Sequence, residues 1–289
     1  MKKFTYSVLV VLYNPERRIL KQLDIYANEF DKVYLFDNSD EKVEWITEFA
    51  KSRNIEYYSS NNVGITGALN VIIPIAINEK FDFIATMDQD TIFPSEVIQK
   101  MISNIELNYK EDIAIYTTNF NKMYVGEGGK IEYSKPEYDI NKVTYTNFHI
   151  SSGNFLRCDL ISNLFPLDNY FIGFVDFDLD FSVKTLGYKI LVIGECIISQ
   201  QIGNPIKASV FTKQGLTNFS SSRYYYLYRN NYYFNNKFKN YKEAKKFAKM
   251  KRIKYFIKLL TTERNKIEKI KMSYKGYCDY KKGILGIKK

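Results

Sequence analysis

Two closely spaced carboxylates follow an apolar segment early in the chain. Asp88 and Asp90 flank Gln89 directly after Phe81–Met87, which reads as a buried strand. In an open α/β sheet ligands bind outside the carboxyl ends of the strands, so both carboxylates are expected where a nucleotide would sit. Their oxygens suit a hard divalent cation, which in turn neutralises a diphosphate. An Asp-x-Asp pair by itself also occurs in ordinary turns.

A second acidic group lies among aromatic residues near position 176. Asp176, Asp178 and Asp180 alternate with apolar residues. The dipole of a helix stabilises acids in its first turn, which accounts for one or two of them. Burial beside aromatic rings would raise the pKa of a carboxyl group and suit a general base. The segment is therefore a candidate source of catalytic acid–base chemistry.

Polar residues also follow the first two predicted strands. Asn14 follows Ser7–Tyr13, and Asp37 ends Lys32–Asp37. A carboxylate at the second position could accept a hydrogen bond from the N–H of a uracil or thymine base. Turn formation and helix N-capping are the alternatives, since Asn and Asp favour both.

The segment 61–70 opens a predicted helix with two glycines. Gly64 and Gly67 would let the backbone approach a ligand closely, and the N-terminus of a helix favours phosphate. The segment lacks both the Gly-x-Gly-x-x-Gly of dinucleotide binders and the Gly-Lys-Ser/Thr of a P-loop. Classical NAD and ATP sites are therefore not supported.

The elements that must position these residues alternate over the first ninety positions. The predicted strands are Ser7–Tyr13, Lys32–Asp37, Ile55–Ser59 and Phe81–Met87. The predicted helices are Glu16–Phe30, Val43–Ser52 and Ile65–Glu79, the last with a kink at Pro74. This alternation predicts an α/β fold, with a mostly parallel Rossmann-like sheet and helices on both of its faces.

After residue 90 the pattern is less regular. We expect helices at Ser95–Tyr109, Asp159–Leu164 and Asp176–Leu186. We expect strands at Ile113–Thr118, Val143–Phe148 and Lys189–Ile193. A hairpin or excursion is indicated by Gly126, Gly128, Gly129 and Pro136, and a later loop by Gly203 and Pro205. From Arg223 the chain reads as helical, first rich in Tyr and then in Lys.

Six short motifs occur in one order along the chain. They are Tyr13-Asn14-Pro15, Asp37-Asn38, Asn62-x-Gly64-Ile65, Asp88-Gln89-Asp90, Ser152-Gly153 and Phe171-x-x-x-Val175-Asp176-x-Asp178. In this order they resemble family 2 glycosyltransferases of the GT-A fold. The Asp-Gln-Asp variant, with Arg223-x-Tyr225-Tyr226 and Arg229-Asn230 downstream, is most similar to the bacterial rhamnosyltransferase branch. The resemblance covers about residues 6–235 and implies a catalytic domain at 1–225, followed by a basic helical extension at 226–289.

The resemblance implies a role for each matching position. The residues it assigns to the nucleotide-sugar site are Tyr13, Asn14, Asp37, Asn62, Gly64, Asp88, Gln89, Arg223 and Arg229. Asp37 would read the pyrimidine ring, and Asp88 and Asp90 would hold the donor through Mg²⁺ or Mn²⁺, with Asp90 the more direct ligand. Asp176 matches the catalytic base, which deprotonates an acceptor hydroxyl for in-line attack on the anomeric carbon and so inverts configuration. Asp178 would support the base or bind the acceptor.

The chain departs from this family at several positions. Many relatives place a His after the last strand of the sheet, where this chain reads Ile198-Ser199-Gln200-Gln201. A Gln side chain coordinates a metal only through a neutral carbonyl. Val175 replaces an acid of many relatives, as it does in the rhamnosyl branch. The one histidine, His149, is expected to pack near the Ser151-Ser152-Gly153 turn and not to serve a hydrolase site.

The surplus positive charge is confined to the C-terminal segment. The chain has 42 Lys+Arg and 32 Asp+Glu, a net charge of +10, and residues 240–289 carry 17 of the bases and 4 of the acids, a net charge of +13. The rest of the chain is slightly acidic, at −3, which disfavours a nucleic-acid-binding protein. Apolar residues spaced by three and four among the lysines suit an amphipathic helix at an anionic membrane surface. A helix packed on the catalytic domain, with a solvated lysine face, is the alternative.

The cysteine spacing and the hydropathy of the chain indicate its location in the cell. The widely spaced Cys158, Cys196 and Cys278 indicate neither a zinc site nor a disulfide framework. No apolar stretch approaches the roughly 18 residues of a spanning helix, and the N-terminal one is too short for a signal peptide. We expect a cytoplasmic protein that associates peripherally with the inner face of the cell membrane.

The expected activity is the inverting, metal-dependent transfer of one sugar. The resemblance favours rhamnose from dTDP-rhamnose as donor and a cell-surface polysaccharide or lipid-linked glycan as acceptor. Trp45 is the only tryptophan, so the Gln-x-x-Arg-Trp signature of processive synthases is absent. The alternatives are another donor such as a UDP-hexose, a nucleotidyltransferase, and a non-catalytic basic membrane-binding protein. A nucleotidyltransferase would need a Gly-rich basic loop after the first strand, and residues 14–18 (Asn-Pro-Glu-Arg-Arg) match such a loop poorly.

Overall fold

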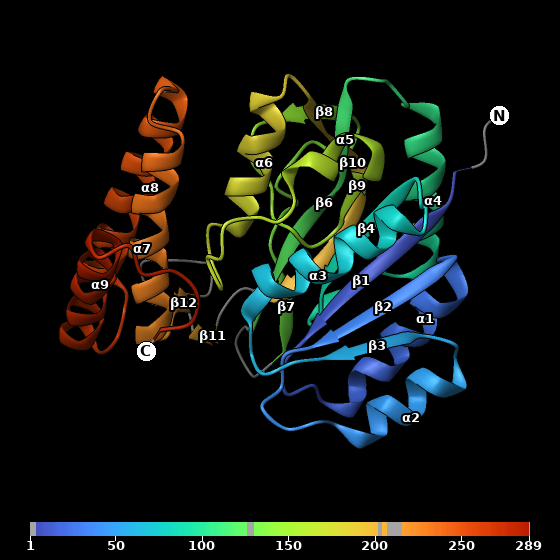
Figure 1. Cartoon of the computed structure of the whole chain (residues 1–289), viewed down its shortest axis with the longest axis horizontal. Helices are drawn as coiled ribbons and strands as arrows, with labels where there is room; N and C mark the ends of the chain where they lie inside the picture. The colour runs from blue at the N-terminus through green and yellow to red at the C-terminus, as the bar shows by residue number, and fades with distance from the viewer. Residues whose placement is uncertain (1–3, 126–129, 202–203, 207–215, 289) are drawn as a thin grey trace.

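Strands from both halves of the chain form one mixed sheet at the centre of the molecule (Figure 1). The computed structural model describes residues 4–125, 130–201, 204–206 and 216–288. The strands of the sheet are β1 (Tyr6–Leu12), β2 (Lys32–Asp37), β3 (Glu56–Ser59), β4 (Phe83–Asp88), β5 (Thr91–Ile92), β6 (Ile113–Val125), β7 (Ile131–Tyr133), β8 (Val143–Thr146), β9 (Asn154–Arg157) and β10 (Lys189–Gln201). The order is β3-β2-β1-β4-β9-β6-β10-β5, with β7 beside β6 and β8 beside β10. β3, β2, β1 and β4 run parallel, as do β6 and β10, and β9 is antiparallel to both its neighbours.

Helices cover both faces of this sheet. They are η1 (Arg17–Ile19), α1 (Leu20–Glu29), α2 (Glu44–Ser52), α3 (Gly64–Asn78), α4 (Ser95–Leu107), α5 (Cys158–Ile161), η3 (Ser162–Leu164) and α6 (Val175–Thr185). Alternate residues of β1 face opposite cores, as the two-residue period of a strand requires. Val8 and Val10 pack in the cluster of α1, α2 and α4, and Leu9 packs in the cluster of α3, α5 and α6. The α/β class expected from the sequence is confirmed.

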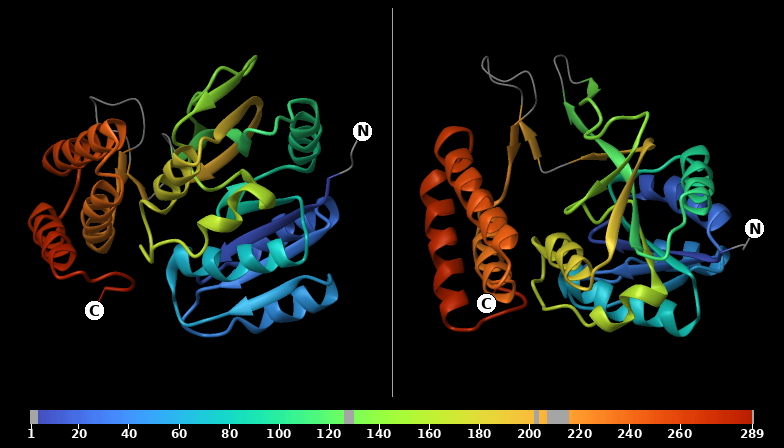
Figure 2. Two further views of the ribbon diagram at one scale, coloured as in Figure 1. Left: turned by 45° about the horizontal axis from the view of Figure 1, so that its top comes forward. Right: turned by 90° about the horizontal axis from the view of Figure 1, so that it is seen from above.

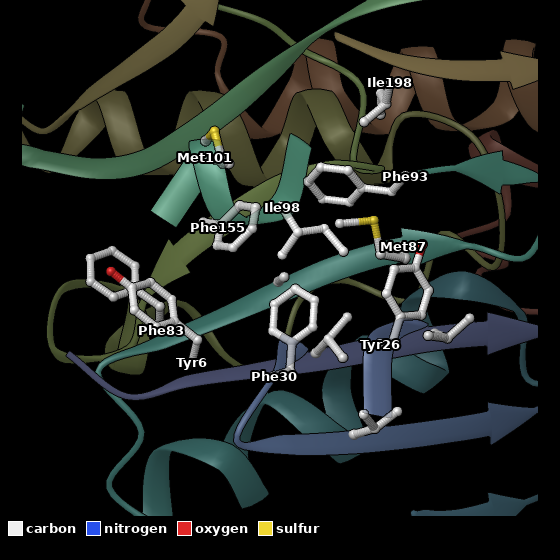
Figure 3. Close-up of a cluster of buried hydrophobic side chains, with 14 of the residues drawn as sticks. Tyr6, Tyr26, Phe30, Phe83, Met87, Phe93, Ile98, Met101, Phe155 and Ile198 are labelled. Carbon is white, nitrogen blue, oxygen red and sulfur yellow. The ribbon is translucent and has the colours of Figure 1, made fainter. Parts of the chain in front are cut away.

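Aromatic rings fill the first of these cores (Figure 3). Tyr6 stacks on Phe83 with ring centroids 5.2 Å apart, and Phe30 stacks on Phe155 at 6.0 Å. These rings come from β1, β4, β9 and the residue that follows α1, so one layer joins elements that are distant in the sequence. Burial on this scale stabilises the sheet on which the functional residues stand.

Four local expectations require correction or completion. No strand was expected at β9, but its four residues are buried and pair with both β4 and β6. β10 continues to Gln201, well beyond the expected end at Ile193, because a register shift there keeps it paired with β6. Pro205 lies in a small strand, β11 (Asn204–Ile206), paired with β12 (Leu216–Asn218). Pro74 lies within α3, which runs unbroken from Gly64 to Asn78. Gly126, Gly128, Gly129 and Gly203 lie outside the described residues.

The C-terminal helices pack together on one side of the sheet, next to α6 (Figure 2). They are α7 (Ser221–Lys237), α8 (Lys242–Thr261) and α9 (Lys266–Lys281). Gly276 lets α9 approach α7 closely, since a Cβ there would lie 2.4 Å from the carbonyl oxygen of Tyr225. The expected boundary between residues 225 and 226 falls inside α7. In the part of the chain that the structure describes, no helix is long and apolar enough to span a membrane.

Candidate active site

Parallel pairing brings the ends of three strands to one edge of the sheet. Leu12 of β1 is in register with Asp37 of β2, and Val11 is in register with Asp88 of β4. Asn14, Asp37 and Asp88 are therefore neighbours at the carboxyl ends of the strands, where α/β sheets bind ligands. The sequence prediction that these polar residues share one edge is confirmed.

Asp88 is held by residues from two other segments. Its carboxylate accepts a hydrogen bond from Gln200 Nε2 at 2.7 Å, and its backbone N–H donates to Ser152 Oγ at 3.1 Å. Burial raises the pKa of Asp88 to about 7, and the charges of Asp90 and Asp176 act in the same direction. Negative charge is thus concentrated here and stabilised by few positive groups, a situation that a cation would relieve.

Asp176 lies in the first turn of α6, which begins from a tightly constrained loop. Phe171, Gly173 and Phe174 all adopt positive φ angles, between 66° and 78°. The loop rests on the start of α3, where the backbone N–H of Thr66 donates to the carbonyl oxygen of Phe171 at 3.4 Å. Burial raises the pKa of Asp176, although Arg223 opposes this rise. A half-buried carboxylate with a raised pKa is suited to accept a proton.

Positive groups from the C-terminal helices face Asp176. Arg223, in the first turn of α7, interacts electrostatically with both Asp176 and Asp88. Lys251 of α8 interacts with Asp176, and its ammonium lies 4.4 Å from the centroid of the Phe177 ring. Burial lowers the pKa of Lys251 to about 8, helped by the charge of Lys254 and opposed by that of Asp176. The candidate site is therefore closed on one side by the basic segment.

Asp178 points to a different side of α6 from Asp176. Its carboxylate is buried and accepts hydrogen bonds from Lys237 Nζ at 2.7 Å and from the Tyr170 hydroxyl at 3.2 Å. Lys237 belongs to α7 and also bridges Asp168 at 3.1 Å. Burial outweighs the attraction of Lys237 and raises the pKa of Asp178 to about 6. In this position Asp178 attaches α6 to α7 and does not face the strand ends.

Arg229 and Asn230 hold the loop that precedes α6. Arg229 is fully buried, and its guanidinium donates to the carbonyl oxygens of Tyr170 at 3.0 Å and Gly286 at 2.8 Å. The amide of Asn230 donates to the carbonyl oxygens of Tyr170, Ile172 and Gly173 at 2.9–3.0 Å. The structure thus places Arg229 behind the site, where it positions the backbone that leads to Asp176.

Gln89 joins the ends of β1 and β4. Its side-chain oxygen accepts from the Tyr13 N–H at 2.8 Å, and its amide nitrogen donates to the Tyr13 carbonyl at 3.0 Å. Asn14 adopts a positive φ of 44°, and its N–H donates to Ser39 Oγ at 2.7 Å. Asn14, Gln89 and Asp90 line a cleft of about 680 Å³ together with Arg18, Lys21 and apolar residues of α1. The Tyr13 ring is 46% exposed at this edge.

Asp37 and Asn62 stabilise the turns on which they stand. The buried carboxylate of Asp37 accepts from the Ser39 N–H at 2.9 Å, the Ser39 hydroxyl at 2.5 Å and the Tyr57 hydroxyl at 2.8 Å. About one of its four acceptor positions remains. Asn62 accepts from the N–H of Gly64 at 3.2 Å. These contacts stabilise turns, which is one of the two roles that the sequence allowed. Recognition of a base by Asp37 would use its remaining acceptor position.

The residues around Asp88 fit a divalent cation. Gln200 Oε1 is buried without a hydrogen-bond partner, directly beside the amide nitrogen that contacts Asp88. Asp88, Asp90 and this carbonyl are oxygen donors of the kind that Mg²⁺ and Mn²⁺ prefer. Among the described residues, no three His, Cys, Asp or Glu side chains are grouped closely enough to hold a metal on their own. A metal here would therefore take further oxygens from a bound diphosphate.

The sequence matches a known family over more than half of its length. Residues 7–165 match the profile of Glycosyl transferase family 2. The chain belongs to this family. The match covers the strand ends at Asn14, Asp37 and Asp88 and stops before α6, which carries Asp176. A search of curated proteins finds no match.

One solved structure supports the GT-A fold of this family 2 member, and two others match it with TM-scores below 0.5. GalNAc-T7, crystallised with UDP, GalNAc and Mn²⁺, is 13% identical and superposes with a TM-score of 0.53 over 73% of this chain and 46% of that one. TarS of S. aureus is 16% identical, with a TM-score of 0.45 over 69% and 37%. A TarS fragment, 1–349, crystallised with UDP, is 13% identical. It superposes with a TM-score of 0.48 over 96% of this chain and 71% of that one. This chain thus spans less than half of the first two proteins.

Lys251 and Tyr255 are the residues near Asp176 that sequence reasoning did not single out. Both lie on α8, some 75 residues after Asp176, and Tyr255 interacts electrostatically with Arg223 and Asp176. No local motif marks them. A signal was present in the spacing of Phe247, Lys251 and Tyr255, which lie four residues apart on one helix face, with a lysine between two aromatic residues.

Proposed function

We propose that this family 2 glycosyltransferase transfers a single sugar from a nucleotide-sugar donor with inversion of configuration. The observation that carries the proposal is the grouping of Asp88 and Asp176, on separate elements, around the single guanidinium of Arg223. A diphosphate beside Asp88 and an acceptor hydroxyl beside Asp176 would lie on two sides of one anomeric carbon. That is the arrangement that an in-line displacement needs.

In the proposed reaction Asp176 takes the proton of the acceptor hydroxyl. The hydroxyl oxygen then bonds to the anomeric carbon, and the bond from that carbon to the diphosphate oxygen breaks. The electron pair leaves with the nucleoside diphosphate, whose charge Arg223 helps to stabilise. Mg²⁺ or Mn²⁺, held by Asp88 and Asp90 with the carbonyl of Gln200, would supply further neutralisation of the leaving group. The raised pKa of Asp176 strengthens it as a base.

The proposed donor is dTDP-rhamnose. This choice rests on the Asp88-Gln89-Asp90 and Arg229-Asn230 motifs, which resemble the rhamnosyl branch. A UDP-hexose is the second candidate, because the GalNAc-T7 structure of similar fold holds UDP and GalNAc. Both nucleotides carry a pyrimidine N–H, which the carboxylate of Asp37 would accept in the proposed complex. We propose a cell-surface polysaccharide or a lipid-linked glycan as acceptor, and a cytoplasmic location at the inner face of the membrane.

A donor panel tests the function. The full chain is incubated with dTDP-rhamnose, UDP-glucose, UDP-galactose and UDP-GalNAc with Mg²⁺ or Mn²⁺, and release of the nucleoside diphosphate is measured. Asp176→Asn and Asp90→Asn are expected to lower kcat/KM by at least about 100-fold. Asp112→Asn is the control, because Asp112 pairs with Lys189 at the opposite end of the sheet. Unchanged turnover in Asp176→Asn would refute the assigned base.

A further inference from the structure

The helix α8 has two apolar faces, only one of which is packed. Ala244, Ala248 and Leu259 are buried on the inner face, and Phe247 stacks on Phe148 with ring centroids 3.9 Å apart. Lys251 lies on this inner face and interacts with Asp176. The inner face therefore belongs to the candidate active site, and the outer face is a separate surface.

The outer face of α8 carries a row of large apolar side chains, here called the α8 stripe. Each is 48–59% exposed, and they are Met250, Ile253, Phe256, Ile257 and Leu260. Their spacing of three and four residues places them on one side of the helix. On α9, Ile267, Ile270 and Tyr274 repeat this spacing and are 46–73% exposed. Exposed apolar rows of this kind usually mark a surface that contacts a partner or a membrane.

Lysines surround the stripe and determine what can cover it. Those of α8 that are exposed are Lys242, Lys245, Lys246, Lys249 and Lys254. Glu243, the only acid of the helix, is engaged by Lys184. With +13 on residues 240–289, a second copy of the chain would repel this surface. Nucleic acid would match the charge and leave the apolar row in water, whereas an anionic bilayer satisfies both features.

We propose that the α8 stripe and its lysines dock the protein on an anionic lipid bilayer. The apolar side chains enter the interface between headgroups and acyl chains, and the lysines contact the headgroup phosphates. Asp176 of α6 then faces the inner side of α8 through Lys251, so the width of one helix, about 10 Å, separates the two faces of α8. If the proposed glycosyl transfer holds, on which this last step rests, the acceptor is a membrane-borne lipid-linked glycan that reaches Asp176 along α8.

Vesicle binding by the full chain tests the docking surface. Vesicles of phosphatidylcholine, with or without about 30 mol% phosphatidylglycerol, are sedimented with the protein. Binding is expected only to the anionic vesicles and is expected to weaken with salt. The variant I253E/I257E is expected to lose at least about tenfold in affinity. The control is Leu107→Glu, because Leu107 is 83% exposed on α4, away from the C-terminal helices. Removal of residues 240–289 is unsuitable, since it strips α9 from α7.

The possible outcomes distinguish membrane docking from self-association of the chain. Equal binding of wild type and I253E/I257E to anionic vesicles overturns the proposal, as does equal binding to neutral and anionic vesicles. A change from dimer to monomer in I253E/I257E, with vesicle binding unchanged, would assign the stripe to self-association. Donor hydrolysis is measured in parallel without lipid and should be equal in the variant and wild type. A wild type that binds vesicles and hydrolyses no donor would leave docking intact and refute the proposed function instead.

Discussion

Gly64 starts α3 at the point where this helix meets the loop that leads to Asp176. Its φ angle is +74°, and a Cβ built there would lie 2.2 Å from the carbonyl oxygen of Phe171 and 2.7 Å from the carbonyl carbon. Both neighbours are backbone atoms, which do not move as easily as the end of a flexible side chain. Gly64→Ala must therefore displace the Phe171 backbone by about 1 Å, since close-packed interiors leave no free space.

The loss of stability can be separated into two parts. An alanine in the left-handed region costs about 1–2 kcal/mol, reduced by about 0.4–1 kcal/mol because the unfolded chain is less flexible. Overpacking against Phe171 adds about 1–3 kcal/mol. Gly187→Ala is a matched control, since Gly187 has a φ of +87° and no atom within 4 Å of its Cβ position. We expect Gly64→Ala to cost about 2–4 kcal/mol and Gly187→Ala about 1 kcal/mol or less.

Urea unfolding followed by circular dichroism measures both values, and steady-state kinetics measures the consequence for the site. Because the displaced loop leads directly into the helix turn that carries Asp176, Gly64→Ala should lower kcat more than Gly187→Ala does, with the KM for the donor little changed. The sequence resemblance instead places Gly64 beside the donor. If Gly64→Ala raised the KM for the donor and matched Gly187→Ala in stability, the contact with Phe171 would not be the reason for the glycine.

Three further predictions follow from buried charges. The pKa of Asp178 is raised to about 6, so the folded state keeps a proton that the unfolded state loses above about pH 4. The free energy of unfolding therefore falls as the pH rises from about 4 to 6. Urea titrations at several pH values should show that Asp178→Asn removes this fall, and the variant should retain donor hydrolysis. Lys251→Gln removes a positive charge that lowers the pKa of Asp176, so the acid limb of the kcat/KM profile should move to higher pH, while Lys249→Gln on the exposed face should leave the profile unchanged. Mn²⁺ added with a nucleoside diphosphate should raise the melting temperature more at pH 8 than at pH 5.5. The reason is that Asp88, with a pKa of about 7, must lose its proton to bind the metal. An equal increase at both pH values would contradict a role of Asp88 as ligand.

The first half of the fold was predictable because its signals are local. β1, β2 and β4 are short apolar segments, each followed by a turn residue, so both the strands and their shared edge could be read from the sequence. β9 could not, because Asn154–Arg157 is stabilised by pairing with β4 and β6, which are distant in the sequence. The long course of β10 likewise depends on its partner β6 and not on its own composition.

The same distinction applies to the site. Asp88, Asp90 and Asp176 were found from motifs, and the structure brings Asp88 and Asp176 together with Arg223. Asp178 shares the motif of Asp176, but a helix turns by about 100° per residue, so two positions separate their side chains onto different faces. Lys237 then binds Asp178 from α7. A motif specifies which residues are present, whereas the packing partner determines which way each carboxylate faces.

Arg229 shows how a residue of a motif can bind the backbone of its own protein. A buried guanidinium needs acceptors for its donors, and this one finds two carbonyl oxygens and the side chain of Asn230. One of these carbonyls, that of Tyr170, lies at the start of the loop before Asp176, and the other, that of Gly286, lies at the end of the chain. The C-terminal segment is therefore part of the support of the catalytic loop. The same segment presents the α8 stripe to the outside.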